Sequence, residues 1–418
     1  MKEKIKIGYI GLGRRGYNVL ANEFLLMQDV EITWICDLVD AKIERTVKKI
    51  EENGRPTPKC TTDYREVLAD PTLDAVVIMI GWSGRPAMAM ESMRAGKYTA
   101  IEVGVADTLE ECYDLIRTYE ETKVPLMMLE NCCYGRREML ALNLKSEGLL
   151  GRIMHCTGGY HHYLNDVELF VEVEGDSVPH YRLEHYEKKN RENYPTHELG
   201  PIAKVLGINR GNRMTSLISV ASGAVGIADY AAHRFGEDSS FATREYRQGD
   251  IVNTVITCAG GETVLLTLDT TLPRAYYSRN FSVRGTRGLV DEARKVVFFE
   301  GMKEEIADNE AEMYEKYDHP LHAEYVKIGE RGGHGGMDWL VCRAFVESVK
   351  RGTNTPIDAY DTVTWMAVGP LSEQSVAAGG APVAFPDFTN GKWQNREPIT
   401  EGKYCLDTVI TDSETEIV

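Results

Sequence analysis

Apolar runs alternate with charged, helix-periodic segments through the first third of the chain. Short continuous apolar runs occupy residues 5–10, 30–36, 75–80, 98–103 and 124–129. Between them lie segments with helical spacing, at 41–52, 84–97 and 108–122. Continuous apolar strands are typical of a parallel sheet that is covered on both faces. The alternation predicts an α/β Rossmann domain with a doubly wound parallel sheet over residues 1–130.

The pattern changes after residue 130. One amphipathic helix is expected over 137–152, and helices return at 335–352 and 361–379. The strand-like runs between them are spaced by turn residues, which predicts a large open, mostly antiparallel sheet. These runs lie at 152–163, 215–222, 250–260, 262–272, 280–292 and 295–301. We therefore expect an α+β substrate and oligomerisation domain over 131–386, whose last helices pack back on the first domain, and an extended tail over 387–418.

The turn after the first strand carries Gly11, Gly13 and Gly16, and the second strand ends at Asp37. This arrangement is typical of a dinucleotide site. Gly11 permits a tight turn, Gly13 lets the backbone approach a pyrophosphate, and Gly16 lets the helix pack close to the strand. The helix N-terminus offers free N–H groups to the phosphates. Asp37 is placed to accept both ribose hydroxyls, which favours NAD, whereas Arg14 and Arg15 leave NADP open.

Composition narrows the class of protein. The chain has 418 residues and a net charge of −17, so nucleic acid is not an expected partner. The nine cysteines include no CxxC pair, which favours a reducing compartment over disulfides or metal fingers. The chain enters its first strand at once, and no apolar run reaches the roughly 20 residues of a membrane helix. We expect a cytoplasmic protein with no membrane association.

The glycine turn, followed by a sheet-rich domain, resembles the Gfo/Idh/MocA oxidoreductases. Most members of that family carry Glu-Lys-Pro after the fifth strand, and its lysine handles a proton. Here the same position reads Glu102-Val103-Gly104. The missing lysine disfavours a simple alcohol oxidation.

A narrower resemblance covers most of the chain, from the first strand to about Trp393. It rests on the strings MMLENCCYGRREM, GGYHH, NYPTHELGP, NRGNR, GGHGGMDW and PLSEQSVAAG. These are similar to the NAD-dependent α-N-acetylgalactosaminidases of glycoside hydrolase family 109. The resemblance implies a redox-neutral cleavage of a glycoside. NAD takes a hydride from C3 of the sugar, a base removes the acidified C2 proton, and the C1 leaving group departs. Water then adds at C1, C2 is reprotonated, and the hydride returns to C3.

The resemblance also implies residues on the sugar side. His197, Tyr160 and Tyr194 are the candidate catalytic side chains, and which of them is the C2 base stays open. Imidazole suits this task because it exchanges protons near neutral pH. The residues expected to bind the substrate are Arg182, Tyr276, Glu130, Thr196 and Pro195, with Tyr277 a near-equal competitor of Tyr276.

On the cofactor side, the carboxyl ends of parallel strands are where ligands bind in open α/β sheets. Glu102 and Val103 follow the fifth strand, and Asn131 follows the sixth. We expect these residues at the nicotinamide ribose or amide, and Trp82 in the lining of the cofactor pocket. No metal is expected. His161 and His162 point to opposite faces of a strand, and the His334–Asp338 spacing favours a helix start, with Asp338 at its positive end.

Three functions remain open from the sequence. The first is an NAD-dependent glycosidase that acts on N-acetylgalactosaminides or related glycosides. The second is an NAD(P)-dependent sugar or polyol dehydrogenase, with His197 as its base. The third is a cofactor-binding protein without catalysis. The missing lysine disfavours the second, and the intact His, Tyr and Glu set disfavours the third. The expected partners are a small-molecule glycoside and further copies of the chain, as a homo-oligomer.

Overall fold

The computed structural model describes residues 2–170, 180–302, 306, 308–329 and 331–410. The chain folds into two compact units, each assembled from separate stretches of sequence. The first unit comprises Met1–Ser146, Asp318–Thr364 and Glu397–Val418, and the second comprises Glu147–Tyr317 and Trp365–Arg396. The domain boundaries expected at 130 and 386 stay predictions. Among the described residues, no helix combines the length and apolar character needed to cross a bilayer.

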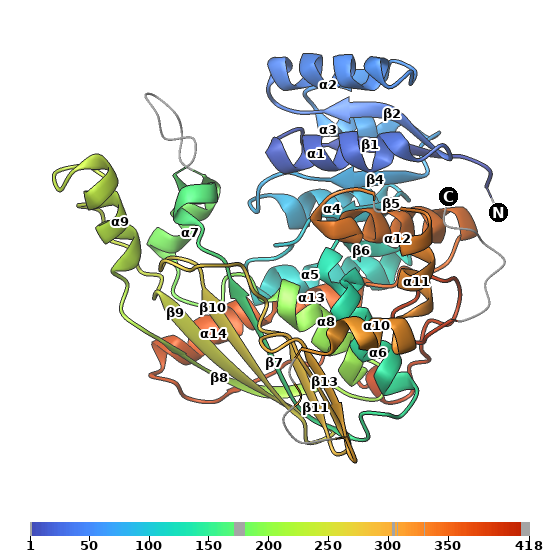
Figure 1. Ribbon diagram of the computed structural model, residues 1–418. Helices are drawn as coiled ribbons and strands as arrows, with labels where there is room; N and C mark the ends of the chain where they lie inside the picture. Colours follow the sequence, from blue (N-terminus) through green and yellow to red (C-terminus); the bar gives the residue numbers. More distant parts are fainter. Residues whose placement is uncertain (1, 171–179, 303–305, 307, 330, 411–418) are drawn as a thin grey trace. The chain divides into compact units, whose positions relative to one another are not determined.

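The first unit contains a six-stranded sheet in the order β3-β2-β1-β4-β5-β6, with every neighbouring pair parallel. Figure 1 shows this sheet with the helices that connect its strands. The order reverses between β1 and β4, which confirms the doubly wound Rossmann prediction. The strands are β1 (Ile5–Ile10), β2 (Val30–Cys36), β3 (Lys59–Thr61), β4 (Ala75–Ile78), β5 (Tyr98–Ile101) and β6 (Leu126–Met128).

Helices of the first unit come from both ends of the chain. α12 follows the GGHGG segment and packs against β1 and the 3-10 helix η2, with Trp339 and Phe345 fully buried. The helices are α1 (Arg14–Asn22), α2 (Asp40–Glu52), α3 (Tyr64–Ala69), α4 (Arg85–Arg94), α5 (Leu109–Thr122), α6 (Arg136–Ser146), α11 (Pro320–Lys327) and α12 (Met337–Arg351). Short 3-10 helices are η1 (Phe24–Leu26), η2 (Asn131–Tyr134) and η4 (His334–Gly336), and α13 (Ala359–Met366) carries the division between the units.

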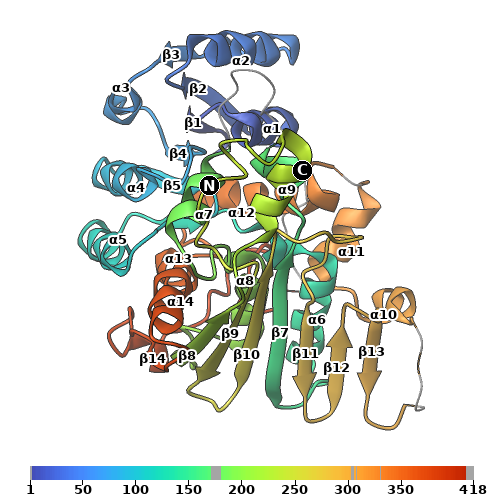
Figure 2. The same ribbon diagram turned by 90° about the vertical axis from the view of Figure 1, so that its left-hand side faces the viewer.

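The second unit contains an eight-stranded sheet in the order β13-β12-β11-β7-β10-β9-β8-β14, seen side by side in Figure 2. Only the pairing of β7 with β10 is parallel among these described strands, as the mostly antiparallel prediction requires. The run expected at 280–292 is two strands joined by a tight turn. The strands are β7 (Ile153–His161), β8 (Met214–Ala221), β9 (Ile251–Cys258), β10 (Thr263–Asp269), β11 (Ser282–Gly285), β12 (Gly288–Asp291), β13 (Val296–Phe299) and β14 (Val383–Ala384).

Helices cover one face of this sheet. α8 packs against β7, and α14 packs against β8. The close approach of α8 requires Gly158, because a Cβ there would lie 2.6 Å from the Cβ of Glu198. The helical segments of this unit are the π-helix η3 (Asn165–Leu169), α7 (Tyr181–Lys188), α8 (Thr196–Leu206), α9 (Gly226–Phe235), α10 (Glu310–Tyr317), α14 (Val368–Ala377) and the 3-10 helix η5 (Lys392–Gln394).

Part of the stretch that the sequence marked as a tail is buried, although most residues from 390 to 402 are exposed. Tyr404, Cys405 and Leu406 are buried, and the Tyr134 hydroxyl donates a hydrogen bond to the Tyr404 carbonyl at 2.8 Å. The acidic end expected at the C-terminus lies outside the described residues. Residues 404–406 therefore contribute to the core of the first unit.

Candidate active site

The glycine turn of the first unit has the geometry of a dinucleotide site, and we call its surroundings the nucleotide site. Gly11 has φ of +97°, and a Cβ there would lie 2.6 Å from the backbone of Met79. A Cβ on Gly16 would lie 2.1 Å from the Gly11 carbonyl oxygen. Beside Gly13, in contrast, the space is open, and no side chain caps the N-terminus of α1. An open backbone approach at a bare helix N-terminus fits a pyrophosphate.

Asp37 lies directly after β2, where the sequence places a ribose-binding acid. Its carboxylate accepts hydrogen bonds from the backbone N–H groups of Leu12 at 2.7 Å and Val39 at 3.0 Å. Lys42 lies 3.7 Å from the same carboxylate. These contacts tie the acid to the glycine turn, so the residues present fit an NAD molecule that spans the turn and the end of β2.

The two arginines of the turn differ. Arg14 is exposed, whereas Arg15 points back into the unit. Arg15 Nε donates to Glu102 Oε2 at 3.0 Å, and its two terminal nitrogens bind the Asp338 carboxylate at 2.6 and 2.8 Å. A guanidinium held by two acids is neutralised, so it does not provide the free positive charge that a 2′-phosphate would need.

Asp338 is the centre of this network, and sequence reasoning paired it with His334 but missed its contacts with Arg15 and Asn131. Besides Arg15, it accepts hydrogen bonds from Asn131 Nδ2 at 2.7 Å and His334 Nδ1 at 2.8 Å. Hydrogen bonds from Arg15 and His334 hold the pKa of the Asp338 carboxyl well below its usual range, against the opposing effect of burial. The expectation that Asp338 begins a helix is confirmed, since α12 starts at Met337.

A second arginine fixes the ends of β4 and β5. Arg85 is buried at the start of α4 and donates to the carbonyl oxygens of Ile80 at 2.6 Å and Glu102 at 3.0 Å. Trp82 is also buried, and its indole packs so close to Gly104 that no Cβ would fit between them. Sequence reasoning missed Arg85, although an arginine beside the proline at the start of a helix is a visible signal.

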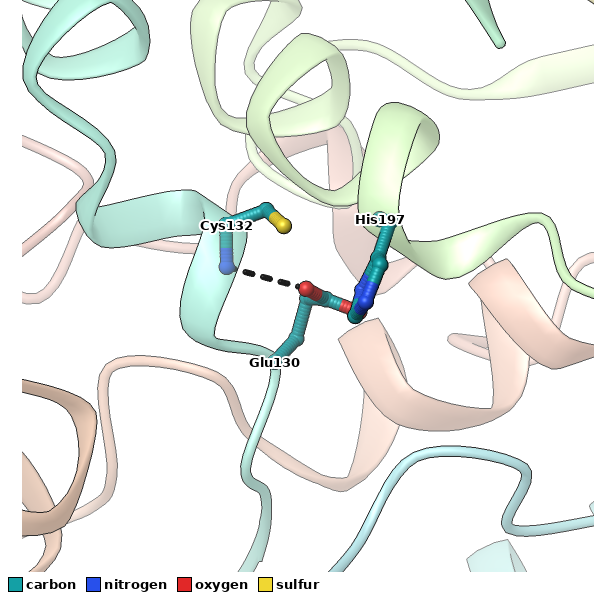
Figure 3. A group of neighbouring side chains, drawn as sticks. All are labelled: Glu130, Cys132 and His197. Carbon is teal, nitrogen blue, oxygen red and sulfur yellow. Dashed lines mark hydrogen bonds between the residues drawn. The ribbon is translucent and has the colours of Figure 1, made fainter. Parts of the chain in front are cut away.

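Glu130 follows β6 and is completely buried. Its carboxylate accepts a hydrogen bond from the backbone N–H of Cys132 at 3.0 Å, as Figure 3 shows. The neighbouring Asn131 is turned to Asp338, and its Oδ1 lies 3.5 Å from the Cys132 thiol. Val103 is buried, and its N–H donates to the Glu102 carboxylate at 3.0 Å. Each predicted cofactor residue after β5 and β6 is thus held by contacts within the first unit.

The second unit gathers the aromatic residues predicted on the sugar side. Tyr160, at the end of β7, stacks on Tyr194 with ring centroids 4.5 Å apart and planes inclined by 30°. His197 stands edge-on to both, with its ring centroid 5.5 Å from Tyr160 and 4.8 Å from Tyr194. Pro195 and Thr196 begin α8, so His197 lies on its first turn, as Figure 3 also shows. The structure therefore brings all three candidate catalytic side chains together.

Two further rings complete what we call the aromatic cluster, defined as Tyr160, His162, Tyr194, His197 and Tyr277. The Tyr160 hydroxyl lies 3.2 Å from His162 Nδ1. Tyr277 stands edge-on to His162 at 5.1 Å and to Tyr160 at 6.3 Å. Tyr276 instead has 68% of its surface exposed, and Tyr277 is the member of the pair that meets the cluster. His162 was missed as a site residue, although it follows Tyr160 at the strand spacing that puts both on one face.

Arg182 of α7 lies beneath this cluster. Its guanidinium sits 4.6 Å from the Tyr194 ring centroid and pairs with Glu168 of the π-helix η3 at 3.0 Å. Burial raises the pKa of Tyr160 well above its usual range, while the positive charge of Arg182 opposes that rise. The phenol is accordingly protonated at neutral pH.

A buried acid supports the backbone before α8. Glu192 is 1% exposed, and its carboxylate accepts a hydrogen bond from the Tyr194 N–H at 3.1 Å. The Glu192 N–H donates to the Ser372 hydroxyl at 2.8 Å, which ties this segment to α14. Burial raises the pKa of Glu192 to about 8, although the Tyr194 N–H and Arg191 act against it. The backbone of the NYPTH segment is thus held in place by the Glu192 carboxyl group through its hydrogen bond with the Tyr194 N–H.

Comparison with known families assigns both parts of the chain. Residues 5–130 match the model "Oxidoreductase family, NAD-binding Rossmann fold". Residues 134–395 match "Glycosyl hydrolase 109, C-terminal domain". The first unit therefore carries an NAD-binding fold, and the larger match covers more than half of the chain.

Individual proteins agree with these matches. A glycosyl hydrolase family 109 protein of Stenotrophomonas maltophilia is 38% identical, over 96% of this chain and 93% of its own. An alpha-N-acetylgalactosaminidase of Tannerella forsythia is also 38% identical, over 94% of this chain and 88% of its own. Among solved structures, an NAD binding oxidoreductase from Klebsiella pneumoniae has a TM-score of 0.70 at 17% identity, covering 92% of this chain and all of its own. A levoglucosan dehydrogenase in complex with NADH and L-sorbose has a TM-score of 0.68 at 17% identity, with the same coverage. At this identity the two structures share the fold.

Proposed function

This chain belongs to glycosyl hydrolase family 109, and from that premise we propose that it is an NAD-dependent glycosidase acting on N-acetylgalactosaminides or related glycosides. The observation that carries the proposal is the contact of Tyr160, Tyr194 and His197 in one aromatic cluster, with centroid distances of 4.5–5.5 Å. Such a cluster offers an imidazole and two phenols for proton transfer at one sugar ring. It needs no pair of facing carboxylates.

When bound, NAD supplies a reversible acceptor for the hydride at C3 of the sugar. We assign His197 as the base that removes the C2 proton once C3 is a ketone, since imidazole exchanges protons near neutral pH. The C1 leaving group then departs, water adds at C1, and His197 returns a proton to C2. C3 finally regains its hydride and O3 its proton, so the reaction is a net hydrolysis. Tyr160 stays protonated because it is buried, so it donates a hydrogen bond to a sugar oxygen.

Binding of the sugar falls to the rest of the second unit in this proposal. Arg182, Tyr277, Thr196 and Pro195 border or support the cluster, and we assign Arg182 to the ring hydroxyls or the acetamide oxygen. Its pairing with Glu168 holds the guanidinium in one orientation, which lowers the entropy cost of binding. Glu130 remains a candidate for the sugar side as well.

We assign the cofactor to the nucleotide site. Gly11, Gly13, Gly16 and the nearby Arg14 form the pyrophosphate turn, and Asp37 binds the adenosine ribose. The residues assigned to the nicotinamide end are Trp82, Glu102, Val103 and Asn131. The neutralised Arg15 and the acid at Asp37 favour NAD over NADP.

A panel of nitrophenyl glycosides tests the function directly. The proposal expects release of nitrophenol without net NADH, and deuterium at C2 of the product when the reaction runs in heavy water. A substrate deuterated at C3 should be cleaved more slowly. Steady NADH accumulation with a free sugar, and no nitrophenol, would instead identify a sugar dehydrogenase.

We also propose a homo-oligomer in a reducing compartment such as the cytoplasm. Ile218, Val220 and Val255 are 40%, 52% and 41% exposed on one face of the eight-stranded sheet, and Ile218 pairs directly with Val255. Clustered exposed apolar side chains of this kind are typical of subunit contacts. All nine cysteines are free, which suits a reducing compartment. Light scattering of the purified protein tests the assembly.

A further inference from the structure

One buried carboxylate of α12 joins three segments that the chain brings from far apart in sequence. Asp338 is 2% exposed and binds Arg15 of the glycine turn through two hydrogen bonds of 2.6 and 2.8 Å. It also accepts from Asn131, after β6, at 2.7 Å. Arg15 carries the connection on to Glu102, after β5, at 3.0 Å. A single side chain thus fixes residues at the ends of both strands beside the nucleotide site.

The loop before α12 is shaped to deliver this carboxylate. His334, Gly335 and Gly336 have φ of +53°, +64° and +90°, so the chain turns sharply before the helix begins. His334 Nδ1 lies 2.8 Å from Asp338, and Gly333 N–H donates to the buried Glu23 at 2.9 Å. Four hydrogen bonds to one buried carboxylate satisfy both of its oxygens, which is the condition for keeping a charge inside a protein.

We infer that Asp338 is the positioning residue of the nucleotide site, holding Asn131, Arg15 and Glu102 in the arrangement that receives the nicotinamide end of NAD. The inference rests on the assignment of Asn131 and Glu102 to that end of the cofactor. Their side chains have rotatable bonds, and without a fixed partner each would lose rotamer freedom when NAD binds. Asp338 removes that cost before the ligand arrives. It touches no reacting atom in this scheme and acts only through its neighbours.

The test compares nucleotide binding by folded variants, with no glycoside present. Asp338→Asn is expected to raise the Kd for NAD by about tenfold to a hundredfold, because one partner of a buried charge pair is lost. The Kd for ADP, which lacks the nicotinamide end, is expected to rise by less than about threefold. Calorimetric titration of nucleotide-free protein gives both constants. An unchanged Kd for NAD, or equal losses for NAD and ADP, would overturn the inference.

A matched control separates positioning from the packing of α12. The same helix makes a second buried ion pair five residues on, where Arg343 binds Asp29 at 2.7 and 3.1 Å. Asp29→Asn should lower the melting temperature and leave the Kd for NAD unchanged. If Asp29→Asn raises the Kd for NAD as much as Asp338→Asn does, Asp338 acts through helix packing and the inference fails.

A second variant keeps the inference testable if Asp338→Asn does not fold. Asp338→Glu keeps the charge but moves the carboxylate by one methylene, and it should raise the Kd for NAD by about fivefold or more. Wild-type affinity in this variant would count against a positioning role. These binding measurements contain no glycoside, so a result that contradicts the role of Asp338 does not contradict the proposed glycosidase activity. If the protein proves not to be a glycosidase, the measured Kd values for NAD still test the role of Asp338.

Discussion

The nucleotide site and the aromatic cluster are held in place by opposite means. In the nucleotide site, backbone groups of a glycine turn are left open while nearby side chains are locked by ion pairs around Asp338. In the aromatic cluster, side chains pack ring against ring, and the ion pair of Arg182 with Glu168 lies beside them. The first arrangement offers hydrogen-bond donors, and the second offers stacked rings with proton-transfer groups.

This difference has a chemical reason. A pyrophosphate is recognised by main-chain N–H groups and a helix N-terminus, so the local backbone shape decides binding. A sugar ring that must lose a hydride and a proton needs several side chains at fixed relative positions. Aromatic packing supplies rigidity without placing a permanent charge on the rings themselves. We therefore expect a substitution in the aromatic cluster to leave NAD binding unchanged, and a substitution in the nucleotide site to leave the aromatic cluster intact.

The sharpest way to separate the two regions is His197→Phe. Loss of the proposed base should lower kcat by about a thousandfold, the middle of the range for general-base catalysis, while bound NAD stays at the wild-type level. Nitrophenol release and the nucleotide content of the purified protein measure the two effects. His155→Gln is the control, since His155 lies on the same strand as Tyr160 and its side chain hydrogen-bonds to the Thr263 hydroxyl, outside the aromatic cluster. Full turnover by His197→Phe would end the base assignment.

Gly16→Ala should have the opposite effect, weakening NAD binding while the aromatic cluster stays intact. Its Cβ would meet the Gly11 carbonyl oxygen at 2.1 Å, so the turn must open, and the Kd for NAD should rise by about a hundredfold. Gly13→Ala sharpens the comparison because nothing lies within 4 Å of its new Cβ. That variant should keep the wild-type melting temperature and still bind NAD more weakly, since the methyl group blocks only the ligand. Equal behaviour of the two variants would contradict the assigned roles of these glycines.

Much of the nucleotide site was predictable because its signals are local. Gly11, Gly16 and Asp37 lie within one strand–helix–strand unit, so spacing alone predicts their geometry. The partners of Arg15 were not predictable in this way. Asp338 comes from the opposite end of the chain, and only the packing of α12 on β1 brings its carboxylate to the turn.

The aromatic cluster shows the same limit from another side. Tyr194 and His197 share one short segment, and their proximity follows from the turn that begins α8. Their contact with Tyr160 depends on α8 packing against β7, which no spacing reveals. The choice between Tyr276 and Tyr277 was open for a related reason, because the exact residue at which a strand ends decides which neighbour faces the sheet.

Arg182→Met tests whether the guanidinium of Arg182 contributes to substrate binding at the aromatic cluster. Removing the guanidinium leaves Glu168 without this buried partner and withdraws the cation from the Tyr194 ring, so KM should rise by about tenfold. The pKa of Tyr160 should rise further, since the charge of Arg182 opposes the effect of burial. Steady-state kinetics and an ultraviolet titration of the tyrosines measure both. Glu168→Gln, which keeps the cation, should change KM less, and an equal change would point to packing alone.

The smallest expected effect concerns stability, and it compares one buried acid from each unit. Burial raises the pKa of Glu192 to about 8 and that of Glu23 to about 7. Each folded-state pKa lies above the unfolded value, so the folded chain binds more protons and stability falls as pH rises from about 4.5 through 7 or 8. Each group contributes a slope on the order of 1 kcal/mol per pH unit in that window.

In Glu192→Gln, the free energy of unfolding should therefore fall less steeply between pH 5 and 8, by the contribution of one carboxyl group. Glu23→Gln should have the same effect up to about pH 7. Melting temperatures measured across that range give the slopes. Glu184→Gln is the control, because Glu184 is an exposed partner of Lys188 on α7 and should leave the slope as it was. A wild-type slope in Glu192→Gln would mean that this carboxyl is ionised in the folded protein, and the NYPTH segment would then rest on a buried charge instead of a neutral hydrogen-bonding group.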